Sequence, residues 1–175
     1  SQQSASEYLA RSRDWQERSS WFDLLKGCYK TRVHGDYHLG QILVTKDGRL
    51  LVVDFEGEPH RPAREREAKY SPLRDVAGML RSLNYATGVV ASSHDRQPDS
   101  PSLAWLGAWE SDARARLLSA YRTAIVASPI PIAPENDEAF SKAVAVLETD
   151  KALYEVRYEL SSRPNWAWLP LDSLK

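Results

Sequence analysis

Apolar residues recur at helical spacing through the second half of the chain, and they predict three long helices. The first opens at Ser71-Pro72, a capping serine followed by a proline in the first turn. Its apolar stripe consists of Leu73, Val76, Ala77, Leu80 and Leu83. The second stripe consists of Trp105, Trp109, Ala113, Leu117, Leu118, Tyr121 and Ile125. The third helix runs from about Glu138 to Ser161 and ends before Pro164; its stripe consists of Phe140, Val144, Leu147, Tyr154 and Tyr158.

The first half of the chain reads differently. Its first thirty residues are polar with loosely helical spacing, which favours one or two helices. Residues 41–45 and 49–54 are β-rich apolar runs separated by Lys46-Asp47-Gly48, and an Asp-Gly between two such runs is typical of a hairpin. Residues 55–70 and 91–102 read as loops. The pattern predicts an α+β, mainly helical fold, in which the helices cover the small hairpin and bury their aromatic stripes.

Composition narrows the class of protein. The chain has 175 residues, of which 42% are hydrophobic and 27% charged, with a net charge of −1. This is typical of a globular domain, or of a lobe of a larger one. The chain lacks the excess of basic residues that would indicate a nucleic-acid partner. No apolar run approaches the length of a membrane span. A single cysteine excludes an internal disulfide and a multi-thiolate metal site. Without an export signal, we expect a cytoplasmic protein.

The segment His34-Gly35-Asp36-Tyr37-His38-Leu39-Gly40-Gln41, followed by Asp54, carries the chemistry. Phosphoryl transfer needs a carboxylate to orient the attacking hydroxyl and oxygen ligands to hold Mg²⁺ against the phosphates. Asp36 and Gln41 are five positions apart, as are the base and the metal-binding asparagine of protein kinases. Asp54 follows the second predicted strand, where those kinases carry their second metal ligand. The spacing predicts that Asp36 is the base and that Gln41 and Asp54 bind Mg²⁺.

Two other interpretations use the same residues. In one, Asp36 is only a turn residue, Gln41 a strand-start amide and Asp54 a strand-end cap, since aspartate is common in turns. In the other, His34 and His38 bind zinc. Their i,i+4 spacing favours a metal only on a helix, and this stretch reads as a loop.

These motifs resemble the aminoglycoside-phosphotransferase-like kinases and, among them, the maltokinases. The resemblance covers roughly residues 30–90 and 140–172. It is carried by the stretches His34–Gln41, Asp54-Phe-Glu-Gly-Glu-Pro59, Ser71–Ser82 and Lys151–Trp166. It implies a C-terminal kinase lobe in which the hairpin carries the catalytic loop. It also implies ATP and Mg²⁺, with maltose phosphorylated by ATP at its anomeric hydroxyl for α-glucan and glycogen synthesis.

The resemblance also implies roles for individual residues. The substrate-binding residues would be His38, Glu155, Tyr158, Arg163 and Trp166. His34 would support the catalytic loop, and so would Arg74 or Asp75 in the first turn of the helix that follows Ser71. Asp75 also lies in a first helical turn, where its carboxylate would interact with the helix dipole instead, and the sequence does not decide between the two.

The C-terminal helix has a plainer interpretation. Tyr154 and Tyr158 could be buried while Glu155, Glu159 and Arg163 are exposed, the last two as an i,i+4 ion pair. Glu155 and Glu159 share that spacing, so they would repel each other unless a cation or ligand lay between them. Aromatic faces beside charged groups would, in contrast, suit a polyhydroxylated ring.

The sequence departs from the kinase pattern before His34. No glycine-rich phosphate loop and no strand bearing the phosphate-binding lysine precede it, and Lys26 and Lys30 lie too close to the catalytic loop for that role. We therefore expect residues 1–175 to be a C-terminal lobe without its N-terminal lobe, inactive alone. The family resemblance implies trehalose synthase as a partner, fused or separate. The alternatives are a kinase for an amino sugar or another small hydroxyl compound, and a non-catalytic lobe that docks on trehalose synthase.

Overall fold

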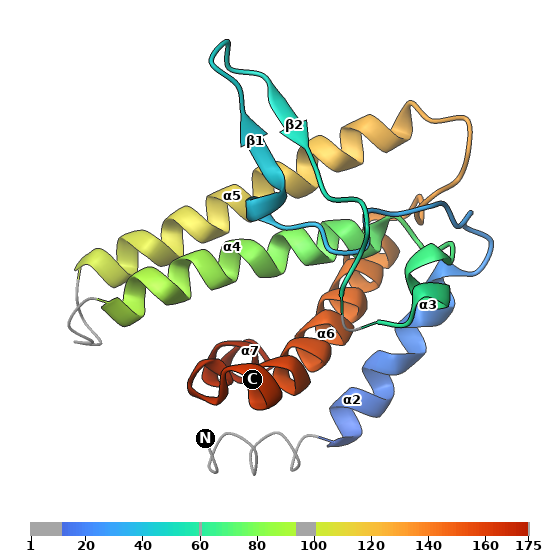
Figure 1. Cartoon of the computed structure of the whole chain (residues 1–175). Helices are drawn as coiled ribbons and strands as arrows, with labels where there is room; N and C mark the ends of the chain where they lie inside the picture. The colour runs from blue at the N-terminus through green and yellow to red at the C-terminus, as the bar shows by residue number, and fades with distance from the viewer. Residues whose placement is uncertain (1–11, 60, 94–100, 175) are drawn as a thin grey trace.

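The computed structural model describes residues 12–59, 61–93 and 101–174, and they are mainly helical with one two-stranded sheet (Figure 1). The predicted elements that reach into residues 1–11 and 94–100 lie outside this range. The described elements are α2 (Ser12–Ser19), η1 (Ser20–Leu25), η2 (Leu39–Gln41), β1 (Ile42–Val44), β2 (Leu50–Val52), α3 (Ala63–Glu67), α4 (Leu73–Ser93), α5 (Pro101–Val126), α6 (Asp137–Ser162), η3 (Pro164–Trp166) and α7 (Trp168–Asp172).

The core forms where α4 packs between α5 and α6. The predicted stripe of α4 is buried throughout, from Leu73 to Leu83. Its central cluster consists of Leu73, Val76, Leu80, Ala133, Phe140, Ala143 and Val144. Helix α6 starts as its sequence predicts, because Asn136 caps it by accepting a 3.0 Å hydrogen bond from the Ala139 amide.

The short α3 and α7 helices were not predicted. Residues 55–70 read as a loop because Ala63–Glu67 is a charged run without an apolar period. There the chain makes one helical turn, with the amides of Glu65 and Arg66 donating to the carbonyl of Pro62. A helix this short has too few positions to display a period, so its pattern gives no signal.

The predicted hairpin is present. Strands β1 and β2 are antiparallel, with Ile42 opposite Val52 and Val44 opposite Leu50. Gly48 closes the turn with a φ of +81°, a conformation that glycine adopts without a steric cost. The pairing continues beyond the strands, because the Val53 amide donates to the carbonyl of Gln41 at 3.0 Å. The register therefore places Gln41 opposite Val53 and close to Asp54, the next residue.

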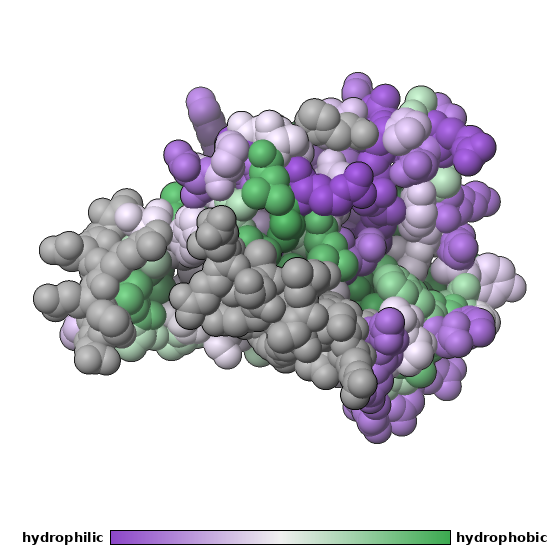
Figure 2. All heavy atoms as spheres, turned by 90° about the horizontal axis from the view of Figure 1, so that it is seen from below, coloured by the Kyte–Doolittle hydropathy of each residue, from purple (hydrophilic) through white to green (hydrophobic). Residues whose placement is uncertain are grey.

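The expectation that helices cover the hairpin is wrong. The hairpin projects away from the helices (Figure 1), and Val44 and Leu50 are 72% and 65% exposed. The aromatic stripe of α5 is also only partly buried, since Trp105 is 64% exposed. The helices bury apolar faces mainly against one another, in the cluster of α4 and α6. On the face seen in Figure 2, too, hydrophobic residues reach the surface between hydrophilic ones.

Candidate functional site

The predicted catalytic loop is anchored to the first turn of α4. The two carboxylate oxygens of Asp75 accept hydrogen bonds from the backbone amides of His34, at 2.8 Å, and Gly35, at 2.9 Å. Of the two roles left open for Asp75, the structure shows the buttress directly. Because both oxygens are used, the loop is fixed in position and in orientation just before Asp36.

His34 ties the loop to the hairpin. Its buried ring shares a 2.8 Å hydrogen bond, through Nε2, with the carbonyl of Val53, and the ring centroid lies 4.8 Å from that of Phe55. His38 uses Nδ1 to accept from the amide of Gly40 at 3.1 Å. Both rings thus have backbone partners, and the described residues include no group of three or more potential ligands around a metal. The zinc interpretation has no support.

A glycine lets α4 approach the loop closely. A Cβ built at Gly78 would lie 2.8 Å from the carbonyl oxygen of Tyr37, nearer than such atoms normally come. One turn later, Ser82 accepts a 3.0 Å hydrogen bond from the amide of Leu39. Asp36 therefore lies in a loop held by Asp75 on one side and by Gly78 and Ser82 on the other.

The two predicted Mg²⁺ ligands lie side by side. The amide nitrogen of Gln41 is 3.0 Å from Oδ2 of Asp54, and turning the amide over would present its oxygen at the same place. Asp54 is the only described non-glycine residue with a positive φ, at +64°. Such conformations are uncommon outside glycine and cluster at functional sites. A carboxylate and an amide oxygen are donors that Mg²⁺ accepts, so the residues fit this ion.

A pocket of about 320 Å³ opens beside Asp36. Five of the predicted site residues line it: Asp36, His38, Glu155, Tyr158 and Arg163. The other described residues that line it are Tyr37, Glu58, Pro59, Gly78, Ser82, Tyr85, Lys151, Tyr154 and Glu159. The predicted residues Gln41, Asp54, His34, Asp75 and Trp166 do not line it.

One face of α6 supplies the charged wall of this pocket. Lys151, Glu155 and Glu159 follow one another at four-residue steps, so they lie along one side of the helix, and Arg163 follows at its C-cap. Glu159 pairs with Arg163, as the plainer interpretation predicted, with nitrogen–oxygen distances of 2.6 and 3.0 Å. Glu159 is nevertheless only 1% exposed, so the pair joins a buried carboxylate to a half-exposed guanidinium.

Arg163 is also held by aromatic rings. Its guanidinium carbon lies 4.9 Å from the ring centroid of Trp166 and 5.6 Å from that of Tyr158. Cation–π contacts of this kind restrict where a guanidinium can move. Trp166 thus supports a pocket residue without lining the pocket, which differs from the substrate contact predicted for it.

Two donors on α4 hold the carboxylates of Glu155 and Glu159. Arg81, which is 1% exposed, donates from Nε to Glu155 at 2.8 Å, and the hydroxyl of Tyr85 donates to Glu159 at 3.2 Å. Burial raises the pKa of Glu155, while Arg81 lowers it by less. Burial also raises the pKa of Tyr85, and both glutamates add to this shift, so its hydroxyl stays a neutral donor.

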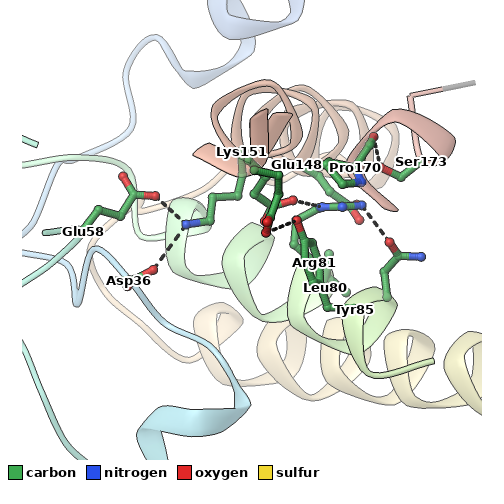
Figure 3. A network of polar contacts seen from close by, with 12 residues as sticks. Asp36, Glu58, Leu80, Arg81, Tyr85, Glu148, Lys151, Pro170 and Ser173 are labelled. Atoms are coloured by element: carbon green, nitrogen blue, oxygen red, sulfur yellow. Dashed lines mark hydrogen bonds and ion pairs between the residues drawn. The ribbon is translucent and has the colours of Figure 1, made fainter. Parts of the chain in front are cut away.

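The sequence missed Lys151 and Glu58. Lys151 lies between the carboxylates of Asp36 and Glu58 (Figure 3) and pairs with both; its Nζ is 3.3 Å from Oδ1 of Asp36. Glu58 is also paired with Arg61 and, at 3.3 Å, with Arg74. The four-residue period that joins Lys151 to Glu155 and Glu159 could have identified Lys151. Glu58 had no such signal, because two of its three partners, Arg74 and Lys151, are distant in the sequence.

Solved and curated sugar kinases match this arrangement in sequence and fold. A curated glucosamine kinase from Streptacidiphilus jiangxiensis is 35% identical over 153 residues, which is 87% of this chain. One from Mycolicibacterium smegmatis is 29% identical over 144 residues. A structure described as glucosamine kinase in complex with glucosamine, ADP and inorganic phosphate superimposes with a TM-score of 0.78 at 32% identity and covers 98% of this chain. No protein-family model matches.

The match covers only part of these relatives. The chain spans 32% of the length of each curated kinase and 38% of the solved chain. None of these relatives is named as a maltokinase or as trehalose synthase, so the comparisons favour the amino-sugar alternative over maltose. No helix among the described residues is long and apolar enough to cross a membrane. Over its own length, the chain is related to the corresponding third of sugar kinases.

Proposed function

We propose that this chain is the acceptor-binding and base-bearing lobe of an ATP-dependent kinase that phosphorylates a hydroxyl of an amino sugar such as glucosamine. The similarity to glucosamine kinases supports the reaction and the acceptor class. In this proposal residues 1–175 keep their predicted place as a C-terminal lobe. The pocket beside Asp36 is the acceptor site.

The charge of the pocket wall favours an amino sugar over maltose. Among the described lining residues, four are carboxylates and two are cations: Asp36, Glu58, Glu155 and Glu159 against Lys151 and Arg163. The arginines that partner Glu58 and Glu155 do not line the pocket. An ammonium group bound here meets these carboxylate oxygens as a positively charged donor, whereas a neutral disaccharide would offer them only uncharged hydroxyl donors. This excess of carboxylates is the observation that carries the choice of acceptor.

Asp36 is placed to act as the base. It lies in the fixed loop, and its carboxylate lines the pocket. In the reaction, Asp36 accepts the proton of the acceptor hydroxyl and the hydroxyl oxygen bonds to the γ-phosphorus of ATP. The bond between that phosphorus and the bridging oxygen breaks, and ADP leaves with its electron pair. Mg²⁺ held by Gln41 and Asp54 would neutralise phosphate charge.

A comparison of acceptors tests this proposal. The full-length protein is assayed with ATP, Mg²⁺ and, in turn, glucosamine, glucose and maltose. Glucose is the matched control, because it differs from glucosamine only in a hydroxyl in place of the amine. We expect kcat/KM for glucosamine to exceed that for glucose by about tenfold or more, because only the ammonium brings a positive charge to the carboxylate, which strengthens the hydrogen bond.

Two results would contradict the proposal. Preference for maltose would restore the maltokinase interpretation. Binding of trehalose synthase without turnover of any sugar would instead favour a docking role. Replacing Glu155 by glutamine should reduce the preference for glucosamine over glucose and leave KM for ATP unchanged.

A further inference from the structure

Lys151 makes the one described ion pair that reaches the carboxylate of the proposed base. Its ammonium nitrogen lies 3.3 Å from Oδ1 of Asp36 and closer still to Oε1 of Glu58 (Figure 3). Among the described residues, no hydrogen bond to Oδ2 of Asp36 is formed. Oδ1 of Asp36 is therefore held by a residue of α6, while Oδ2 of the same carboxylate remains available to accept a hydrogen bond.

The far side of this contact is rigid. The carboxylate of Glu58 is 2% exposed, and it is paired with Arg61 and with Arg74 on the first turn of α4. The ring of Tyr154 lies 5.1 Å from the Lys151 nitrogen and 4.8 Å from the Arg61 guanidinium. Lys151 is thus anchored independently of Asp36, by a cluster that joins α6, α4 and the segment after the hairpin.

Stability alone is a poor reason for a lysine at this place. Removing an ammonium from water costs several kcal/mol, and a buried ion pair is often no more stabilising than packed apolar residues. Burial would lower the pKa of Lys151, but Glu58 and Asp36 raise it by more, so the ammonium stays charged. The position of this ammonium is better explained by what it contacts, which is the carboxylate of the proposed base.

We propose that Lys151 is a positioning residue for Asp36: its ammonium, fixed by Glu58, holds one oxygen of the Asp36 carboxylate so that the other faces the acceptor hydroxyl. The inference rests on the proposed role of Asp36 as the base, but not on the identity of the acceptor. Lys151 acts through Asp36 and takes no part in the transfer of the phosphoryl group.

Three variants of the full-length protein test the role. Lys151→Met keeps the length of the side chain and removes its charge, and Lys151→Arg keeps the charge. Lys142→Met is the matched control on the same helix, because Lys142 pairs only with the exposed Glu138 among the described carboxylates. We expect Lys151→Met to lower kcat about ten- to a hundredfold, as misplacement of a catalytic group does. KM for ATP should not change, Lys151→Arg should recover much of the loss, and Lys142→Met should match the wild type.

The outcomes separate this role from others. A wild-type kcat in Lys151→Met would overturn it. A rise in KM for the acceptor with kcat unchanged would show instead that Lys151 binds the acceptor, and an arginine variant no better than the methionine variant would contradict positioning by charge. Should Lys151→Met fail to fold by circular dichroism, Lys151→Gln takes its place. If the wild type prefers another acceptor, the variants are compared on that acceptor, so the amino-sugar proposal and the Lys151 role fail separately.

Discussion

At the scale of single residues, the surroundings of Asp36 divide the work among several side chains. Asp75 fixes the backbone before it, and Lys151 contacts its carboxylate. Neither residue could replace Asp36, because neither has a carboxylate that lines the pocket. The proposed base and the residues that hold it in place are therefore different side chains.

Replacing Asp36 by asparagine removes the base and keeps the shape of the side chain. In the full-length protein we expect Asp36→Asn to lower kcat by about 10²–10⁴-fold, the usual contribution of a general base. Stability should change little, which urea unfolding would verify. Turnover close to that of the wild type would show that Asp36 is a turn residue and not the base.

The stability of the protein should depend on pH through Glu58. Burial by itself would raise the pKa of Glu58, but Lys151 and Arg61 lower it below its ordinary value of 4.5. The ionised form is therefore favoured by folding, so its stabilising contribution is complete above that value and is lost as the pH falls through the lowered pKa.

The variant Glu58→Gln makes this contribution measurable. At about pH 7 we expect Glu58→Gln to lower the free energy of unfolding by about 3–5 kcal/mol, the usual cost of breaking a buried pair from one side. The difference from the wild type should narrow as the pH is lowered below 4.5. Urea unfolding across this range measures it, with the exposed Glu138→Gln as control. A difference that does not vary with pH would contradict the assignment.

At the scale of elements, α4 works as the frame of the site. Its first turn holds the loop through Asp75, and its next two turns contact the loop at Gly78 and Ser82. Its other face is the apolar stripe that packs in the core. A shift of this helix would consequently move the loop that carries the proposed base.

A methyl group at Gly78 should produce that shift. Because its Cβ would lie 2.8 Å from the Tyr37 carbonyl, helix or loop must move. We expect Gly78→Ala to destabilise the protein by about 1–3 kcal/mol, as overpacking does, and to lower kcat. Gly107→Ala on α5 is the matched control, since a Cβ there meets nothing within 4 Å and alanine favours a helix. Equal behaviour of the two variants would show that the close approach is tolerated.

The elements differ in how far the sequence revealed them. The stripe of α4 and the Asp-Gly turn of the hairpin are local patterns, and both predicted their elements correctly. The prediction that α5 buries its aromatic stripe was wrong, because periodicity locates an apolar stripe but cannot say whether a partner covers Trp105.

In the candidate site, too, local patterns were predictable from the sequence and long-range contacts were not. The loop of Asp36 was found by local spacing, whereas Glu58 and Arg81 gain their importance from partners that only the fold brings near.

At the scale of the whole molecule, the two sides of the site are unequal. The acceptor side is a walled pocket. The side of the proposed metal ligands is open: Asp54 and Phe55 are exposed, and so is most of the neighbouring hairpin.

We therefore expect this 175-residue chain, by itself, not to phosphorylate glucosamine or maltose at a useful rate. Phosphoryl transfer depends on positioning and on stabilisation of charge, and an open metal site would hold ATP weakly and in many orientations. A coupled assay of the purified chain beside the full-length protein checks this. Comparable turnover by the two would show that the described residues are a sufficient kinase.

The four-residue period along α6 has a consequence for how such a protein can change over evolution. Glu155 and Glu159 lie one turn apart on α6 and Arg163 lies at its C-cap, while Asp36, Gln41 and Asp54 belong to the loop and hairpin. Substitutions at these three α6-side positions, but not at Lys151, can therefore alter which molecule is accepted without altering the groups proposed to carry out the transfer. Acceptor specificity could then change while the loop of Asp36 stays the same.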